Sequence, residues 1–214
     1  MNSKVSYLFR FFPKLKKIYY QYYNRLYLKC LGIKYGRNCK IFNKVFILGH
    51  GNVIIGDNFS FYSGDSVNPI SRNIQGCINT VHSGVVEIGN DVGLSSTCIW
   101  AQEKIKIGNN VNVGGDCLIL DNDAHPIDFA IRRNDFLREK GELEYLKNVK
   151  TQPIIIDDDV WIGARCIILK GVHIGARSII AAGSIVTKDI PAWTVAAGRP
   201  AKVLKEIPHR NTEV

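Results

Sequence analysis

The sequence predicts an all-β fold, a parallel β-helix of six-residue repeats, from two observations. Aliphatic or small residues occupy every sixth position without a gap in the C-terminal half: Ile156, Ile162, Ile168, Ile174, Ile180, Val186 and Ala192. Residues able to turn a corner, such as Asp157 to Asp159 and Gly175 to Arg177, separate these positions. Three short strands and three corners then close a coil of about 18 residues. Stacked coils pair as parallel strands around an aliphatic interior.

The same phase continues upstream, although less regularly. It covers Ile107, Val113 and Ile119 and, after one inserted residue, Ile88, Leu94 and Trp100. Residues 60–86 keep the composition but lose the strict phase, and we expect the β-helix to begin near residue 38. From Asp121 to Gln152 the repeat stops, which predicts one long inserted loop. Such a loop is either functional or a tolerated surface insertion.

Three segments are expected: a basic amphipathic helical segment (1–37), the β-helix domain (38–205, with the inserted loop 121–152) and a C-terminal tail (206–214). The apolar residues of the first segment follow helical spacing; they are Leu15, Ile18, Tyr19, Tyr22 and Leu26. Two interpretations remain open for this segment. It caps the β-helix or contacts another subunit, or residues 1–30 lie on an anionic membrane surface.

Composition and charge limit the other possibilities. The 214 residues, 46% of them hydrophobic, suit one globular body, and no apolar run approaches the roughly 18 residues of a spanning helix. The net charge of +9 is concentrated at the N-terminus, because ten basic and no acidic residues precede residue 41. No recognition module accompanies this charge, so no nucleic-acid partner is expected. Six scattered cysteines and no secretory signal pattern favour the cytoplasm.

The inserted loop begins with Asp121-Asn122-Asp123-Ala124-His125-Pro126-Ile127-Asp128, directly after a repeat strand. Here the sequence resembles the hexapeptide-repeat acyltransferases, namely the galactoside, maltose, nodulation-type and surface-polysaccharide O-acetyltransferases, which carry a histidine followed by proline at this point. The resemblance implies a left-handed winding, a short C-terminal helix, a homotrimer, and acetyl-CoA as co-substrate. It also implies that His125 is the general base, a role that suits imidazole because it titrates near neutral pH.

Several neighbours are weaker candidates for supporting this base. Asp123 and Asp128 suit either ring orientation and acceptor contact or simple turns around proline. Ser95 and Ser96 stand near where galactoside enzymes place an asparagine, so a serine hydroxyl or a backbone N–H is left as the oxyanion donor. His82 is a candidate acceptor-binding residue, with a structural or surface role as the alternative. The close histidine pair of the γ-class carbonic anhydrases, which share the fold, is missing, and no metal is expected.

The last third of the chain resembles the family's coenzyme A wall. The resemblance puts Trp161 near the thioester and small residues along the pantetheine arm, with cations at the phosphates. The residues concerned are Trp161, Ala164, Ala182, Gly183, Thr187, Lys188, Arg199, Lys202 and Lys205. A solvated basic rim is the alternative for the lysines.

The predicted function is direct transfer of an acetyl group from acetyl-CoA to a hydroxyl of a sugar or surface-polysaccharide precursor. N-acylation of an amino sugar or antibiotic is the enzymatic alternative, and a non-catalytic repeat scaffold is the other. The expected location is cytoplasmic, peripheral at the inner face of the membrane if the N-terminal segment binds lipid.

Overall fold

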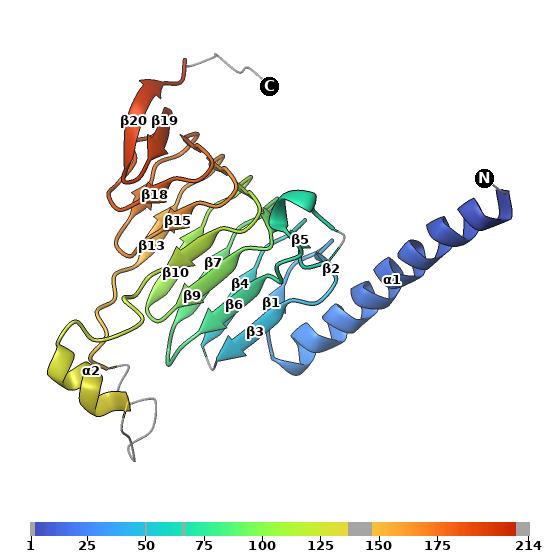
Figure 1. Ribbon diagram of the computed structural model, residues 1–214, viewed down its shortest axis with the longest axis horizontal. Coiled ribbons are helices and arrows are strands. Elements are labelled where there is room, and N and C mark those ends of the chain that lie inside the picture. The colour runs from blue at the N-terminus through green and yellow to red at the C-terminus, as the bar shows by residue number, and fades with distance from the viewer. Residues whose placement is uncertain (1–2, 50, 66, 137–146, 209–214) are drawn as a thin grey trace.

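The computed structural model describes residues 3–49, 51–65, 67–136 and 147–208. Three sheets form the walls of a left-handed parallel β-helix, as predicted from the resemblance (Figure 1). The first sheet contains β1 (Lys34–Tyr35), β4 (Asn52–Ile55), β7 (Val85–Ile88), β10 (Lys104–Ile107), β13 (Ile154–Ile156) and β16 (His173–Ile174). The first strand therefore begins at Lys34, whereas the repeat had been expected to begin near residue 38.

The second sheet contains β2 (Lys40–Phe42), β5 (Ser60–Tyr62), β8 (Gly93–Ser95), β11 (Asn112–Val113), β14 (Trp161–Ile162), β17 (Ile179–Ile180), β19 (Thr194–Gly198) and β20 (Ala201–Glu206). The third contains β3 (Phe46–Gly49), β6 (Cys77–Thr80), β9 (Cys98–Ala101), β12 (Leu118–Leu120), β15 (Ile167–Ile168) and β18 (Ile185–Val186). The chain passes through the sheets in this order in every coil. We call the bends after the first, second and third sheets the first, second and third corners.

The predicted six-residue phase forms the interior. Ile88, Ile107, Ile156 and Ile174 are register partners in the first sheet, and all are buried. The six-residue spacing ends after Val186. Ile190, only four residues after Val186, pairs with Ile174 and takes the next interior position. As a result Ala192 is exposed, contrary to the phase, and Ala196 is buried in its place.

The first corner is held by a ladder of side-chain oxygens. The Oδ1 atoms of Asp57, Asn90, Asn109 and Asp158 each accept a backbone N–H from the neighbouring coil, at 2.7 to 2.9 Å. A glycine precedes the ladder residue at Gly56, Gly89 and Gly108, because the next coil approaches closely. At Gly89 a Cβ atom would lie 2.6 Å from the carbonyl oxygen of Gly108. The repeated Ile-Gly-Asp/Asn pattern is therefore required by stacking.

The N-terminal helix α1 (Ser3–Cys30) contacts the stack through its last turns. Asn24, almost fully buried, donates from Nδ2 to the carbonyl oxygens of Ile41 and Asn43, and Leu28 joins the core. The Tyr27 hydroxyl donates to the Ile47 carbonyl oxygen at 3.1 Å. Figure 1 shows the rest of α1 running away from the coils. No helix among the described residues has the length and apolarity needed to cross a membrane.

Two loops and the C-terminal strand depart from the repeat. A one-turn helix, η1 (Pro69–Ser71), lies in the loop between β5 and β6, where the phase was lost. The long insertion contains the short helix α2 (Phe129–Phe136), and its residues 137–146 lie outside the described part. The expected C-terminal helix is replaced over residues 201–206 by β20, which pairs antiparallel with β19 and so satisfies the edge of the second sheet. Residues 209–214 lie outside the described residues.

Candidate active site

The insertion that carries His125 is anchored where it leaves the β-helix. Asp121, which directly follows β12, is fully buried. Its carboxylate accepts the backbone N–H groups of Gln102 and Glu103, both at 2.8 Å, in the preceding coil. Its carbonyl oxygen accepts the Gln152 N–H at 2.9 Å, which joins the two ends of the insertion. The loop therefore starts from a fixed point.

A tight turn then presents His125. Its backbone N–H donates to the Asp123 carbonyl oxygen at 2.7 Å, and the Asn122 Oδ1 accepts the Ala124 N–H at 2.9 Å. The Asp123 carboxylate is 2.5 Å from the ammonium group of Lys170 in the next coil. Pro126 is buried, while the His125 side chain is exposed. An exposed imidazole thus stands on a turn fixed to the coils on both sides.

Asp128 caps the helix of this loop. Its Oδ1 accepts the backbone N–H groups of Ala130 and Ile131 at 2.7 and 3.4 Å, which makes it the cap of α2. Arg132 on the first turns of α2 donates back to the carbonyl oxygens of Pro126 and Ile127. The geometry therefore fits the turn interpretation of Asp128.

The other sequence-predicted polar residues fall at two different corners. Ser95 ends β8 and Ser96 follows it at the second corner, whereas His125 follows β12 at the third. The Ser95 Oγ accepts from Asn68 Nδ2 at 3.1 Å, and Ser96 is buried. His82 follows β6 and lies at the third corner, two coils before His125. Its Nε2 is buried and has no hydrogen-bond partner among the described residues.

Four of the nine predicted cofactor residues gather at the second corner. Ala164 and Gly183 stack there, with the Gly183 N–H donating to the Ala164 carbonyl oxygen at 2.8 Å. Arg199 Nε donates to the Gly183 carbonyl oxygen at 2.6 Å. Gly114 continues this column of small residues, because a Cβ atom there would lie 2.5 Å from the Ala164 nitrogen. Ala182 is exposed at the same corner, and backbone atoms therefore form much of this surface.

The remaining cofactor candidates surround this corner or lie apart from it. Trp161 is 56% exposed on the outer face of β14, which leads into the second corner. Lys202 and Lys205 are exposed on β20. Thr187 and Lys188 follow β18 and therefore lie at the third corner, on the His125 side. Within one chain, the outer face of the third sheet separates the two groups of candidates.

Sequence reasoning missed two cysteine pairs that stacking creates. Cys77 and Cys98 are register partners on the outer face of the third sheet. Cys117 and Cys166 are buried at the second corner, where hydrogen bonding between the two thiols lowers the pKa of Cys166. The described residues contain no cluster of three or more His, Cys, Asp or Glu side chains able to hold a metal. The spacing of the cysteines along the sequence does not reveal these pairs, because the coils differ in length.

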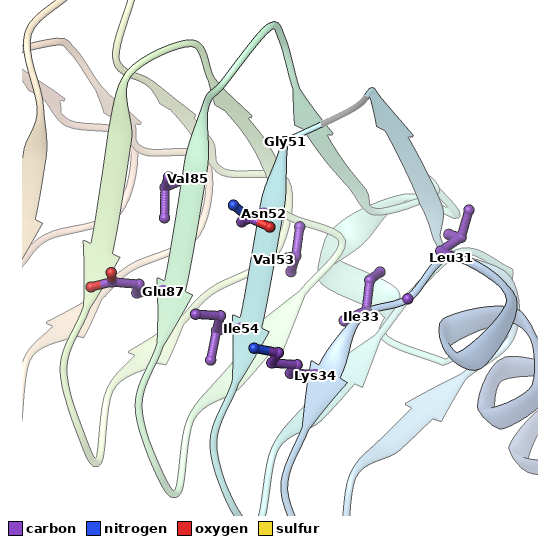
Figure 2. Close-up of a pocket in the computed structure, with 10 residues that line it drawn as sticks. Leu31, Ile33, Lys34, Gly51, Asn52, Val53, Ile54, Val85 and Glu87 are labelled. Carbon is purple, nitrogen blue, oxygen red and sulfur yellow. The ribbon is translucent and has the colours of Figure 1, made fainter.

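Two surface grooves lie at the N-terminal end of the molecule. Figure 2 shows the first, of about 350 Å³, on the outer face of the first sheet between Leu31 and Glu87. The second, of about 430 Å³, lies between α1 and the first coil. Neither groove includes His125 or a predicted cofactor residue.

Known proteins resemble this chain in sequence and in structure. Residues 153–188 match the family model described as the hexapeptide repeat of succinyl-transferase. The matching repeat and the left-handed β-helix resemble those of the hexapeptide-repeat acyltransferases. The structure resembles a variant of AntD, an N-acyltransferase from Bacillus cereus, solved in complex with dTDP-4-amino-4,6-dideoxyglucose and coenzyme A. The TM-score is 0.64 at 26% identity, covering 86% of this chain and 90% of that one.

Two curated relatives share parts of the sequence with this chain. A 2,3,4,5-tetrahydropyridine-2,6-dicarboxylate N-acetyltransferase of Staphylococcus aureus is 61% identical over 54 residues, which is 25% of this chain. A candidate acetyltransferase of Schizosaccharomyces pombe is 45% identical over 103 residues, which is 48% of this chain. The matches span 23% and 44% of those two relatives, so this chain spans less than half their length.

Proposed function

We propose that this protein transfers an acetyl group from acetyl-CoA directly to a hydroxyl of a sugar or a surface-polysaccharide precursor, with His125 as general base. The single observation that carries the proposal is the exposed imidazole on a turn anchored by Asp121, Asp123 and Lys170. Such anchoring fixes a base relative to a rigid wall, and position is what general-base catalysis requires.

The proton movements follow from the reaction. The acceptor hydroxyl gives its proton to the His125 imidazole as its oxygen attacks the thioester carbonyl carbon. The resulting tetrahedral oxyanion collapses, the carbon–sulfur bond breaks, and the imidazolium returns the proton to the thiolate. No covalent enzyme intermediate is needed. Asp123 is a positioning residue in this scheme, because its carbonyl oxygen receives the His125 N–H and its carboxylate is held by Lys170.

The second corner fits a long, thin thioester. Its surface of small residues, Gly114, Ala164, Ala182 and Gly183, leaves backbone groups accessible to a pantetheine arm. Trp161 offers an exposed apolar ring beside it. The cations Arg199, Lys202 and Lys205 lie around the end of the second sheet, where phosphates would bind. Ser95 and Ser96 belong to the same corner, and Lys188 and Thr187 would contribute from the third corner of an adjacent copy.

We further propose a homotrimer, because the candidates at the two corners are separated within one chain. The outer face of the third sheet, which lies between them, is apolar. Its outward residues include Cys98, Trp100, Leu118, Leu120, Ile167, Leu169 and Ile185. Packing that face against another copy would bring the second corner of one chain beside the third corner of its neighbour and complete the site. All six cysteines are free thiols, which suits action in a reducing cytoplasm.

N-acylation of an amino sugar is the second candidate. It is favoured by the likeness to AntD, whose solved complex holds a nucleotide-linked amino sugar. The two acceptor classes make different demands on a base. A hydroxyl must lose its proton during attack, whereas a neutral amine already has a reactive lone pair. Dependence on His125 should therefore be stronger for hydroxyl acceptors.

The decisive measurement is thiol release from acetyl-CoA across a panel of matched hydroxy and amino sugars, free and nucleotide-linked. We expect His125→Ala to lower kcat/KM for a hydroxyl acceptor by about 10²- to 10⁴-fold. The control is His173→Ala, since His173 is also an exposed histidine but pairs with Asp157 at 2.8 Å on the first sheet. Unchanged turnover in folded His125→Ala would refute the mechanism, and turnover of amino sugars alone would establish the second candidate.

A further inference from the structure

Helix α1 carries an apolar stripe that its own chain leaves uncovered. Five large apolar side chains are 46 to 70% exposed. They are Leu15, Ile18, Tyr19, Tyr22 and Leu26. At 3.6 residues per turn these positions share one face of the helix. This confirms the helical spacing read from the sequence for the part of α1 whose side chains are described, from residue 14 onward.

Most of the stripe faces away from the β-helix, and Tyr22 and Leu26 border the groove between α1 and the first coil. Asn24 and Leu28, the buried residues of α1, lie on the opposite side of the helix and hold it to the first coil. Capping of the coil by α1 therefore uses a different face and leaves the stripe exposed. Figure 1 shows α1 projecting beyond the stack, so that its outer face is accessible over several turns.

The surroundings of the stripe are strongly basic. Residues 1–56 contain no aspartate or glutamate. Lys16 lies 3.8 Å from Asp65 and Lys17 lies over the Phe42 ring, so these two cations face the protein's own coils. Lys14, Arg25 and Lys29 are exposed and make no ion pair with the described residues. The stripe is thus bordered by positive charge with nothing acidic on its own helix.

A groove of about 430 Å³ adjoins the stripe. Tyr22 and Leu26 of the stripe form part of its wall, so the two surfaces are continuous. Arg25 and Lys29 line it from α1, and Arg37 from the first coil. Arg37 is 88% exposed while it pairs with Asp57 at 2.7 Å, and its guanidinium keeps the Asp57 pKa low by hydrogen bonding. Two unpaired cations and a third at the rim make a groove suited to a phosphate group.

We infer that α1 docks this protein on an anionic phospholipid surface, with the stripe in the acyl-chain boundary and a headgroup phosphate in the Arg25–Lys29 groove. An apolar face bordered by lysine and arginine is the arrangement that lies flat in a membrane interface. Charge argues against a second copy of α1 as the occupant. Two such helices would bring cations together without an acidic partner. The inference is independent of the acyl-transfer chemistry.

The test is flotation of the full chain with vesicles of phosphatidylcholine alone or with phosphatidylglycerol added. We expect binding to the anionic vesicles only, weakening as salt is raised because surface charges are screened. Ile18→Asp should weaken it at least about tenfold, since a charge enters the apolar face. The matched control is Ile70→Asp, because Ile70 is exposed to 55% on η1 and Ile18 to 51% on α1.

A second pair of variants tests the groove. Arg25→Gln combined with Lys29→Gln should weaken binding to anionic vesicles about 25-fold, because each basic residue near such a surface contributes roughly fivefold in affinity. Lys106→Gln combined with Arg177→Gln removes the same charge from exposed positions elsewhere and should have little effect. Circular dichroism confirms that every variant is folded.

Three results would overturn the inference. The first is equal binding to both vesicle types, and the second is equal loss in the Ile18 and Ile70 variants. The third is a change of oligomeric state on Ile18→Asp without any vesicle binding, which would assign the stripe to a protein contact. Acyl transfer to a soluble acceptor is measured separately, so its failure leaves the lipid result intact.

Discussion

The stacked coils and the insertion after β12 are held in place by different kinds of contact. In the coils each residue is determined by neighbours above and below, as in the oxygen ladder of the first corner and the isoleucine columns. The insertion has no such repeat and is held at a few points, chiefly Asp121 and the Asp123–Lys170 pair. The regular part therefore supplies rigidity, and the irregular part presents the exposed histidine. Variants in the two regions should have correspondingly different effects.

The largest effect is expected in the core of the coils. Ile162→Ala removes a fully buried side chain and should lower the free energy of unfolding by about 2 to 5 kcal/mol, because a cavity is left behind. Phe129→Ala in α2, where the ring is 67% exposed, should change it by only about 0.5 kcal/mol or less. Urea unfolding measures both. Equal losses would mean that the insertion is as tightly packed as the coils.

A smaller effect is expected where the two regions join. Asp121→Ala leaves two part-buried backbone N–H groups without their acceptor and should cost about 2 to 4 kcal/mol. Asp158→Ala removes a similar acceptor at an exposed corner, where water replaces it, and should cost about 1 kcal/mol or less. Chemical denaturation of the two variants compares them directly. If Asp121→Ala costs no more than Asp158→Ala, the insertion has another anchor.

The smallest effect is expected inside the insertion. Asp128→Ala removes the cap of α2, worth about 1 kcal/mol to the helix, and should speed hydrogen exchange of the α2 amides without changing global stability. Asp128→Asn keeps a capping oxygen and should retain both protection and acyl-transfer activity. Loss of activity in Asp128→Asn with α2 still protected would instead assign the carboxylate a catalytic supporting role.

The periodic part of the fold could be predicted because one local rule repeats. The six residues found at six-residue steps from Ile156 to Val186 are all buried, as that spacing predicts. The rule fails where the coil length changes. Ala192 is exposed because Ile190 takes the interior position, and the loop containing η1 interrupts the phase upstream. The C-terminal strand β20 was not predicted, because no local pattern in residues 201–206 indicates it. The strand forms because it pairs with the open edge of β19.

The site was predictable in part. The His-Pro pair after a repeat strand marks His125 through resemblance, and its role stays a prediction. The separation of Ser95 and Ser96 from His125 could not be read from the sequence, because corner identity depends on which sheet each strand joins. Likewise Cys77 and Cys98 meet only through strand register, and nothing local identifies Asp121 as a buried anchor rather than a turn residue.

By itself the sequence determined the β-helix, its long interruption, the basic amphipathic helix and a histidine worth testing, because each is a pattern among near neighbours in the chain. Only the tertiary structure decided which residues share a corner, which face of α1 stays uncovered and which carboxylate holds the insertion. Those relations join residues from different coils. Their physical cause is stacking, which brings together atoms that the spacing of residues along the chain does not relate.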